Sequence, residues 1–367
     1  MKRRDFIKYG TILAGACGIC LLRKCNLLHP ETVDINSVQE IKACKIPFER
    51  MEILAGGDVF PCSATFLNSK KPAGNIKKQD IQEIWNGKVY TQLRNKILKG
   101  DYSLCNTGNC YIYDYCSPEK ISQDYKNGPK EITIGYDDEC NYRCITCRDN
   151  VIINTSEQLN LYDKFYLPKI IKAAENAEIV TLLCNGDPMF SRHSKHLMSE
   201  LVKAYPNIKF RLTTNGFHLD EKTLNKIGIQ NNIQVVSVSI NATKRETYKK
   251  IMRTDGFDIV MKNVEMMSDW FKQGKIAFLN LNFVVHLMNY KEMPDFVKLA
   301  KNLNAKAIFT TYKPWVGAKL HKKYNEIAVF EPTNKHYKEF SEMMKNPVFK
   351  DAEHCKLESE LYNLAYS

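Results

Sequence analysis

The sequence lacks low-complexity tracts and any repeat at a solenoid period, which excludes a disordered chain and a repeat array. It also lacks an apolar run of about 20 residues, the length that a transmembrane helix needs. Hydrophobic residues make up 44% of the 367 residues and charged residues 26%, which are ordinary values for a globular protein. A chain of this length has room for about two domains, so we expect a core domain and an accessory module.

The formal net charge of +12 comes from lysines spread over residues 70–78, 244–250, 298–306 and 319–323, without regular aromatic interleaving. We interpret them as a solvated basic surface. An acidic peptide, glycan or nucleic-acid partner is the alternative, but the pattern does not predict a specific nucleic-acid partner. Charge alone does not select a function.

The N-terminus carries Arg3 and Arg4 ahead of an apolar run at residues 9–22. This pattern resembles a twin-arginine export signal, whereas an amphipathic helix with basic residues at its start is the alternative. The run is shorter than a transmembrane helix and continues past the nearest small-residue cleavage sequence. We therefore expect residues 1–30 to form a signal or membrane anchor on a cytoplasmic protein, with export as the alternative.

From residue 131 onward, β-rich apolar stretches alternate with segments that repeat apolar residues at helical spacing. Six strands are predicted, at residues 131–136, 179–184, 209–214, 234–240, 277–285 and 306–312. Each gap is long enough for a crossover helix, so the pattern predicts a parallel α/β fold. It does not distinguish an open doubly wound sheet from a partial barrel, but in both the chemistry collects where the strands end.

The segment at residues 31–125 lacks this alternation. It contains a predicted hairpin turn at residues 56–58 and a predicted helix over residues 81–98. Because this segment contains few long apolar stretches, it can form only a small hydrophobic core. We therefore expect a small α+β module that is held together partly by metal. The expected division of the chain is 1–30 signal or anchor, 31–125 cysteine-rich module, 126–330 core and 331–367 C-terminal tail.

Thirteen cysteines exceed what packing requires, and three of them form a C-x3-C-x2-C motif at Cys140, Cys144 and Cys147. Three thiolates on one loop can hold a 4Fe-4S cluster, which needs four ligands, so one iron stays open to a further ligand. The amino and carboxylate groups of S-adenosylmethionine (SAM) could fill that position. Zinc is the main competitor, but residues 130–160 contain no histidine as its fourth ligand, and a disulfide would leave one cysteine over.

Here the sequence resembles the radical SAM superfamily, over residues 131–312. The second predicted strand is followed by Asn185, Gly186, Asp187 and Pro188, which are similar to the GGE motif whose backbone approaches SAM in that family. Asn replaces the first Gly and Asp replaces Glu, while a plain turn would look the same. The resemblance implies a six-stranded partial (β/α)6 TIM-type barrel.

Polar residues also follow the next strands. The Thr-Asn-Gly sequence at Asn215 looks like a family turn, and Ser239 and Asn241 lie in a stretch similar to one in SPASM-bearing members. The resemblance implies that these residues, and Asn282 in the fifth strand, contact SAM. N-capping of the following helices, or a buried and satisfied Asn at 282, is the alternative.

A second group of cysteines precedes the core, and its spacing resembles a SPASM or shortened Twitch module. The resemblance implies one auxiliary 4Fe-4S cluster held by Cys44, Cys62, Cys105 and Cys110, with Cys116 as a substitute or extra ligand. Tetrahedral zinc could use the same thiolates. The module precedes the core, whereas in the family it normally follows. We interpret Cys184 and Cys355 as a buried apolar residue and a spare thiol.

The resemblance implies an enzyme that reductively cleaves SAM to a 5'-deoxyadenosyl radical and modifies a peptide, protein or sugar (glycan) substrate. An electron donor such as flavodoxin or ferredoxin would supply the electron. The cofactor carries the difficult chemistry, and the protein supplies orientation and exclusion of water. The alternatives are a non-catalytic iron-sulfur electron carrier or binding protein that keeps the fold, and a zinc-held scaffold.

Overall fold

The computed structural model describes residues 42–107, 110, 115–121, 123–183, 185–313 and 321–366. The predicted signal or anchor at residues 1–30 therefore lies outside the described residues, as does Cys184. Within the described ranges, no helix combines the length and the apolar character that crossing a bilayer requires.

The strands form one large sheet and one small one. Their order in the large sheet is β12-β11-β10-β9-β8-β7-β6-β2-β3-β4, and β1 pairs with β5 in the small sheet. The strands are β1 (Ala43–Cys44), β2 (Arg50–Leu54), β3 (Asp58–Phe60), β4 (Gly74–Asn75), β5 (Tyr115–Cys116), β6 (Glu131–Gly135), β7 (Ile179–Leu182), β8 (Lys209–Thr214), β9 (Ile233–Ser239), β10 (Phe278–Val285), β11 (Lys306–Thr311) and β12 (Cys355–Leu357).

The six strands predicted from residue 131 onward are β6 to β11. They are adjacent in chain order and all parallel, which confirms the parallel α/β class. The sheet extends beyond them at both edges, because β2 pairs in parallel with β6, and β12 pairs in parallel with β11. The N-terminal segment and the end of the chain therefore add strands to the sheet of the core.

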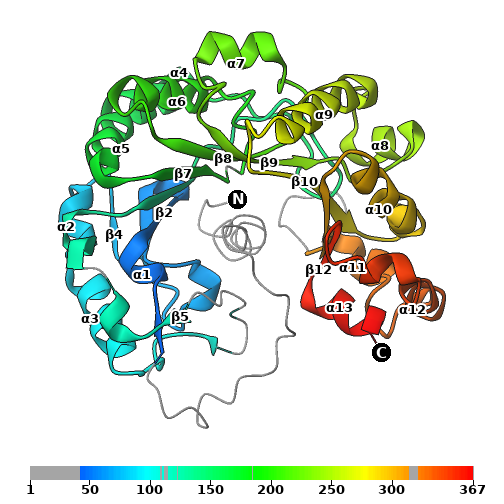
Figure 1. Ribbon diagram of the computed structural model, residues 1–367, viewed down its shortest axis with the longest axis horizontal. Helices are drawn as coiled ribbons and strands as arrows, with labels where there is room; N and C mark the ends of the chain where they lie inside the picture. Colours follow the sequence, from blue (N-terminus) through cyan, green and yellow to red (C-terminus); the bar gives the residue numbers. More distant parts are fainter. Residues whose placement is uncertain are drawn as a thin grey trace.

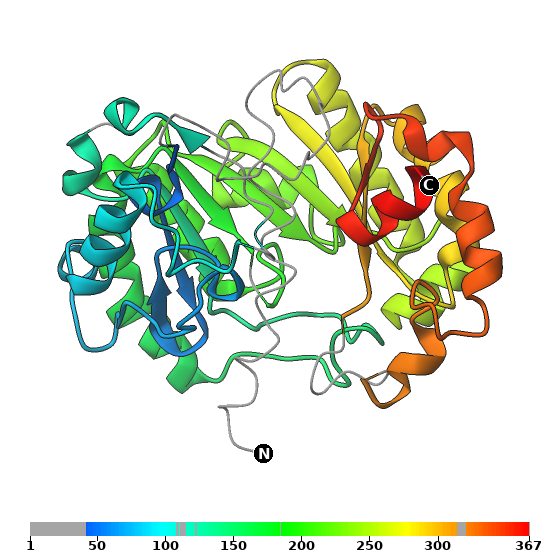
Figure 2. The ribbon, with the colours of Figure 1, turned by 90° about the horizontal axis from the view of Figure 1, so that it is seen from below.

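Helices cover one face of this sheet. Figure 1 shows β7 to β10 on the inner side of an open arc and α4 to α10 on its outer side, and Figure 2 shows the arc from below. The helices are α1 (Ile46–Glu49), α2 (Ile81–Trp85), α3 (Lys88–Leu98), α4 (Ser156–Leu161), α5 (Leu167–Ala173), α6 (Arg192–Ala204), α7 (Glu221–Ile227), α8 (Arg245–Met252), α9 (Phe257–Lys272), α10 (Met293–Asn302), α11 (Tyr324–Ile327), α12 (Tyr337–Met344) and α13 (Ser359–Tyr366).

Alternation along the strands gives the two faces different chemistry. Side chains such as Ile132, Val180 and Phe210 belong to the main hydrophobic cluster together with the helices. Successive strand residues point to opposite faces, and the other face carries polar side chains such as Thr133, Thr181 and Arg211. Arg211 Nη1 lies 3.0 Å from Glu131 Oε2 in one partly buried pair on that face. The inner face of the arc thus carries paired charges, whereas branched apolar residues usually fill a closed barrel.

The predicted helix over residues 81–98 is two helices, because α2 ends at Trp85 and α3 begins at Lys88. Gly87 makes the break: a Cβ there would lie 2.9 Å from the carbonyl oxygen of Glu83 and 3.0 Å from that of Ile84. The backbone of Gly87 is extended (φ −72°, ψ 173°), so the helical ladder stops at this residue.

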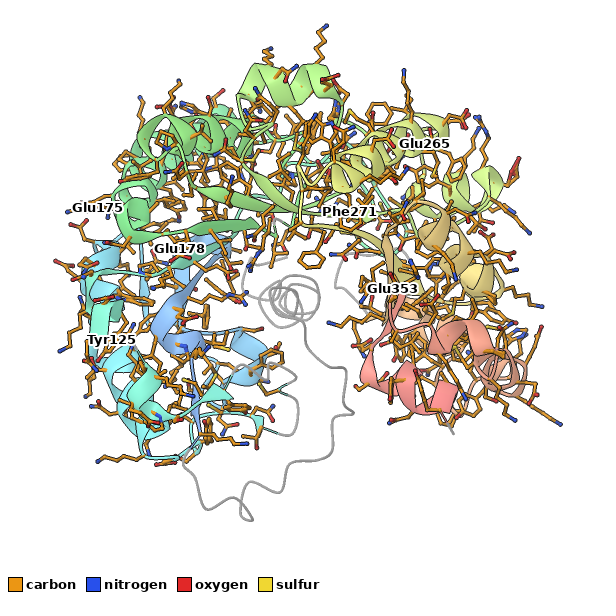
Figure 3. All side chains as sticks on the ribbon, viewed as in Figure 1. Tyr125, Glu175, Glu178, Glu265, Phe271 and Glu353 are labelled. Atoms are coloured by element: carbon orange, nitrogen blue, oxygen red, sulfur yellow. The ribbon has the colours of Figure 1, made fainter. Side chains whose placement is uncertain are left out.

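The N-terminal module is held together by a buried arginine. The guanidinium of Arg94 lies 4.1 Å from the ring centroid of Trp85 and 4.9 Å from that of Tyr125, and it donates to the carbonyl oxygens of Pro47 and Trp85 at 2.8 Å. Figure 3 labels Tyr125 beside the helices of this module. These contacts join α1, α2 and α3 around one cation.

The predicted hairpin at residues 56–58 is present. Gly56 and Gly57 both have left-handed φ angles, 78° and 85°, and they connect β2 to the antiparallel β3. Gly57 is also in a tight position, because an added Cβ would lie 2.6 Å from the hydroxyl oxygen of Tyr166 in the core. The hairpin therefore packs directly against the core.

Candidate iron-sulfur and SAM site

The loop that carries Cys140, Cys144 and Cys147 leaves the carboxyl end of β6. Cys140 exchanges two backbone hydrogen bonds with Ile152, at 2.9 and 3.2 Å, so the loop closes on itself. The backbone N–H of Cys147 donates to the carbonyl oxygen of Cys144 at 3.0 Å. Ile145 N donates to the carbonyl oxygen of Ile251 at the end of α8, at 2.9 Å. Both ends and the middle of the loop are therefore fixed.

The three thiols lie in a partly desolvated environment. Burial raises the pKa of Cys140 to about 12, and burial together with the neighbouring Cys147 and Cys140 raises the pKa of Cys144 well above its usual value. Thiolates that repel one another in a buried place need a cation to become stable ligands. In the described part of the chain, no three Cys, His, Asp or Glu side chains converge on a single ion. Three thiols on one closed loop are a donor set that would suit three irons of a 4Fe-4S cluster.

The carboxylates of Asp137 and Glu139 connect the cysteine loop to the start of α6. Asp137 Oδ2 accepts from the hydroxyls of Ser191 and Ser194 at 2.5 and 2.6 Å, and Asp137 Oδ1 accepts from the side-chain amide of Asn154 at 2.9 Å. These contacts join the residues before Cys140, the residues after the loop and the start of α6. Asp137 was not among the residues predicted from the sequence.

Glu139 makes a second set of contacts on the same helix. Its Oε2 accepts from the backbone N–H of Arg192 at 2.9 Å, and its Oε1 lies 2.8 Å from Arg192 Nη2 and 3.2 Å from the backbone nitrogen of Asn154. A carboxylate at a helix N-terminus is favourable because the free N–H groups and the helix dipole are positive there. Sequence reasoning missed Glu139, although its place directly before Cys140 was a usable signal.

The turn after β7 lies directly on the backbone of the cysteine loop. Gly186 N donates to the carbonyl oxygen of Asp137 at 2.9 Å, and Asp187 N donates to that of Glu139 at 2.8 Å. A Cβ on Gly186 would lie 2.3 Å from the carbonyl oxygen of Glu139, so only glycine fits without movement of the backbone. Asn185 is half-buried and Pro188 is buried beside it.

The carboxylate of Asp187 is fully used within the protein. It accepts from the backbone nitrogens of Met189 and Asn215 at 3.0 and 2.6 Å, and from the hydroxyl of Thr214 at 2.9 Å. Burial raises the pKa of Asp187, and these donors act in the opposite direction by favouring the charged form. Asp187 thus ties the turn after β7 to the turn after β8.

Asn215, at the end of β8, reaches back to the cysteine loop. Its Nδ2 donates to Asn141 Oδ1 at 2.9 Å and lies 4.0 Å from Cys140 Sγ, while its Oδ1 accepts from Phe217 N. The structure therefore brings together Cys140, the turn after β7 and Asn215.

The residues predicted on the next two strands lie side by side. Ser239 pairs with Asn282 in the register of β9 and β10. Asn241 has a left-handed φ of 61°, and its side chain is engaged: Oδ1 accepts from Val284 N at 2.7 Å, and Nδ2 lies 3.4 Å from the sulfur of Met252. The same sulfur lies 3.8 Å from Cys144 Sγ, so Asn241 is connected to the cysteine loop through a thioether that sequence reasoning missed.

The second cysteine group gathers in the N-terminal module, where Cys44, Cys105, Cys110 and Cys116 pack against the small hydrophobic cluster that contains Cys62. Burial raises the pKa of Cys62 well above its usual value, and the charges of Glu52, Cys44 and Cys110 add to the effect. Burial also raises the pKa of Cys105 to about 11, with Cys110 adding to it. Thiols are the usual ligands of a 4Fe-4S cluster, and this module gathers several of them around one hydrophobic cluster.

The remaining cysteine of the described ranges is Cys355, which is buried on β12 opposite Ala307. Its pKa is raised to about 12 by burial. A thiol of this kind behaves as a small apolar side chain.

Comparisons with known proteins agree with this geometry. Residues 44–111 match the SPASM family, described as an iron-sulfur cluster-binding domain, and residues 138–300 match the radical SAM superfamily. The chain is 30% identical over 199 residues to the molybdenum cofactor biosynthesis protein moc-5 of Caenorhabditis elegans, which covers 51% of this chain and 30% of that protein. It is also 30% identical over 181 residues to a probable GTP 3',8-cyclase of Saccharolobus islandicus, covering 46% of this chain and 52% of the relative.

The chain thus spans about half or less of the length of these relatives. Among solved structures, Streptococcus suis SuiB bound to S-adenosylmethionine aligns with a TM-score of 0.46 at 16% identity, covering 77% of this chain and 64% of SuiB. The two matched domains account for the cofactors, since radical SAM and SPASM domains bind 4Fe-4S clusters and SAM. Residues 138–300 of the chain therefore form a radical SAM domain, and residues 44–111 ahead of it form a SPASM iron-sulfur domain.

Proposed function

We propose that this protein is a radical SAM enzyme that cleaves SAM at a 4Fe-4S cluster held by Cys140, Cys144 and Cys147. One observation carries the proposal: the turns after β7 and β8 are hydrogen-bonded directly to the loop that bears these cysteines. When bound and reduced, the cluster supplies an electron to SAM, and this yields a 5'-deoxyadenosyl radical able to take a hydrogen atom from a substrate.

The residues of the chain hold and orient the cofactors in this proposal. Asp137 and Glu139 fix the loop on the start of α6, and the three thiolates of this loop would hold the cluster. The turn of Asn185, Gly186, Asp187 and Pro188 would present its backbone to SAM, because the Asp187 carboxylate is already used by protein donors. Fixed hydrogen-bonding groups of this kind lower the cost of arranging the reactants.

The polar residues at the ends of β8, β9 and β10 would complete the SAM site. Ser239 and Asn282 are adjacent in the sheet, which favours contacts with one molecule. Asn215 and Asn241 would act mainly by supporting the loop, since their side-chain amides are bonded to Asn141, Val284 and Met252. The open arc of strands would then be the partial barrel that surrounds the substrate (Figure 1).

For the domain division, we propose a SPASM module at residues 31–125, a radical SAM core at 126–330 and a C-terminal segment at 331–367. The module would hold one auxiliary 4Fe-4S cluster on Cys44, Cys62, Cys105 and Cys110, with Cys116 as an additional or substitute ligand. The packing of these cysteines in and around one small hydrophobic cluster supports this assignment.

For the substrate, we propose a peptide, protein or sugar, as expected of SPASM-bearing relatives. A nucleotide is the competing class, because the relatives in the comparisons include a probable GTP 3',8-cyclase. The electron would come from a donor such as flavodoxin or ferredoxin, and we place the protein on the cytoplasmic side. Incubation with GTP distinguishes a nucleotide substrate from a peptide, protein or sugar substrate. Consumption of GTP would overturn the peptide, protein or sugar proposal.

Anaerobic reconstitution tests the activity. The protein is loaded with iron and sulfide, reduced with dithionite and given SAM, and 5'-deoxyadenosine is measured by chromatography. We expect product from the wild type and none from Cys144→Ala, while Cys144→Ala should keep the iron of the auxiliary cluster. An intact cluster whose spectrum responds to SAM, without any 5'-deoxyadenosine, would overturn the enzyme assignment.

That negative outcome would support the second candidate, a non-catalytic iron-sulfur electron carrier or binding protein. The observation that favours it is Asp187. This residue stands where the family pattern has Glu, and its carboxylate is fully used by Met189 N, Thr214 Oγ1 and Asn215 N.

A further inference from the structure

The side chain of Arg148, directly after the last cysteine of the motif, bridges three parts of the site. Its Nε lies 3.4 Å from Cys147 Sγ, and its Nη1 donates to the carbonyl oxygen of Asp138 at 2.9 Å. Its Nη2 donates to the carbonyl oxygen of Asn185, in the turn after β7. One guanidinium thus contacts a cluster ligand, the entry to the cysteine loop and the turn assigned to SAM.

The charge of Arg148 reaches the other two thiols as well. Burial dominates and raises the pKa values of Cys140 and Cys144, but Arg148 acts against it and lowers both. An arginine side chain stays protonated in proteins, so this positive charge is permanent. The planar fork also fixes direction, which a lysine ammonium could not do at three acceptors.

A permanent cation beside a cluster ligand has a defined electronic effect. Reduction adds one negative charge to an iron-sulfur cluster, and hydrogen bonds to the ligand sulfurs together with nearby charge set its reduction potential. A donor at Cys147 Sγ therefore stabilises the reduced form more than the oxidised form. The same side chain also holds Asn185, so its loss should loosen the turn after β7.

We propose that Arg148 is a positioning residue that raises the reduction potential of the SAM cluster through Cys147 and holds the Asn185 turn in place for SAM. This inference rests on the cluster assignment in the proposed function. It adds a role for a side chain that is neither a cluster ligand nor part of the SAM-binding motifs.

The test compares Arg148→Met, Arg148→Lys and Arg143→Met in reconstituted protein. Arg143 lies in the same loop but is exposed, so its replacement makes the same change in net charge at a side chain that solvent screens. The midpoint potential is measured by titration with dithionite and mediators, followed by electron paramagnetic resonance, and Cys144→Ala protein supplies the signal of the auxiliary cluster for subtraction. Binding of SAM is measured by equilibrium dialysis.

We expect Arg148→Met to lower the equilibrium constant for cluster reduction about tenfold, which for one electron is about 59 mV. Arg143→Met should leave it within twofold. Arg148→Lys should have a midpoint potential close to that of the wild type, because it retains the positive charge. It should bind SAM several-fold more weakly, because it loses the planar guanidinium. Equal shifts in Arg148→Met and Arg143→Met, or no shift in Arg148→Met, would overturn the proposal.

If Arg148→Met does not hold the cluster, Arg148→Lys and Arg148→Gln carry the comparison, and the lysine variant must have the higher potential. Equality or the reverse order would overturn the inference. The measurements distinguish failure of the enzyme assignment from failure of the proposed role of Arg148. Wild-type protein with the expected order of potentials but no 5'-deoxyadenosine would overturn only the enzyme assignment, while normal product with unchanged potentials would overturn only the role of Arg148.

Discussion

Gly186 occupies the point where the turn after β7 touches the cysteine loop. An alanine Cβ there would lie 2.3 Å from the carbonyl oxygen of Glu139 and 2.6 Å from the carbonyl carbon of Asp138. Both contacts are to backbone, so relief requires breaking the hydrogen bonds between the two loops. We expect Gly186→Ala to lower the free energy of unfolding by about 3 kcal/mol and to reduce the iron content after reconstitution.

Gly274→Ala is the matched control, because a Cβ at Gly274 meets no atom within 4 Å. It has a left-handed φ of 70°, so alanine should cost about 1–2 kcal/mol from backbone strain alone. Urea unfolding and iron analysis measure both variants. Equal iron loss in the two would contradict a specific role for the contact between the loops.

His286, directly after β10, is fully buried and uncharged. Its Nδ1 accepts from Met288 N at 3.2 Å, and burial lowers the pKa of His286 to about 3 from an ordinary value of 6.5. Between these values the unfolded chain binds a proton that the folded protein does not, so stability falls as the pH decreases from 6.5 towards 3.

Between pH 7.5 and 5.5 this residue should cost about 1.4 kcal/mol of unfolding free energy. His286→Gln removes the titrating group. Between the same two pH values, the unfolding free energy of this variant should therefore fall by about 1.4 kcal/mol less than that of the wild type. Urea unfolding at the two pH values provides the measurement. Parallel losses in wild type and variant would show that His286 does not contribute.

Helix α6 is the element that holds the cysteine loop, because its first turn receives both Asp137 and Glu139. Glu139→Gln removes the charge that meets Arg192 and the helix N-terminus. We expect a loss of about 1.5–3 kcal/mol, since a charge-assisted contact becomes a neutral one. Amide hydrogen exchange should accelerate between residues 138 and 154.

Glu157→Gln in the first turn of the neighbouring α4 is the control, since Glu157 is exposed. It should leave exchange in the cysteine loop unchanged. Accelerated exchange in both variants, or in neither, would argue against α6 as the support of the loop.

The elements themselves were largely predictable, whereas their side-chain partners were not. The apolar stretches from residue 131 onward match β6 to β11, because each strand is long enough to show its pattern. The contacts of Asp137 and Glu139 could not be predicted, because their partners Ser191 and Arg192 lie far along the chain, although Glu139 stands directly before Cys140. The predicted helix over residues 81–98 was wrong in its continuity, since a glycine inside a helical pattern does not by itself mark a break.

At the scale of the molecule, the sequence indicated a small separate module, and the structure joins that module to the core. Residues 50–54, which form β2, were not predicted as a strand. Their partner strand β6 begins at Glu131, far from β2 in the sequence. Local periodicity carries no information on such pairing. The cysteine spacing predicted the site because its ligands lie within one loop, whereas the sheet depends on contacts between distant segments.

Because β2 of the module pairs with β6 of the core, we predict that the core does not fold without the module. Removal of residues 1–125 would leave β6 as an unpaired sheet edge and take away the contacts of Lys169 Nζ with the carbonyl oxygens of Ile76 and Gln79, at 2.8 and 2.9 Å. Exposed strand edges pair with other chains. We expect a fragment of residues 126–367 to aggregate, while a fragment of residues 42–367, which keeps every described strand, elutes as a defined species in size-exclusion chromatography. A monomeric 126–367 fragment that loads the cluster would contradict this and would show that the module is an addition to a core that folds without it.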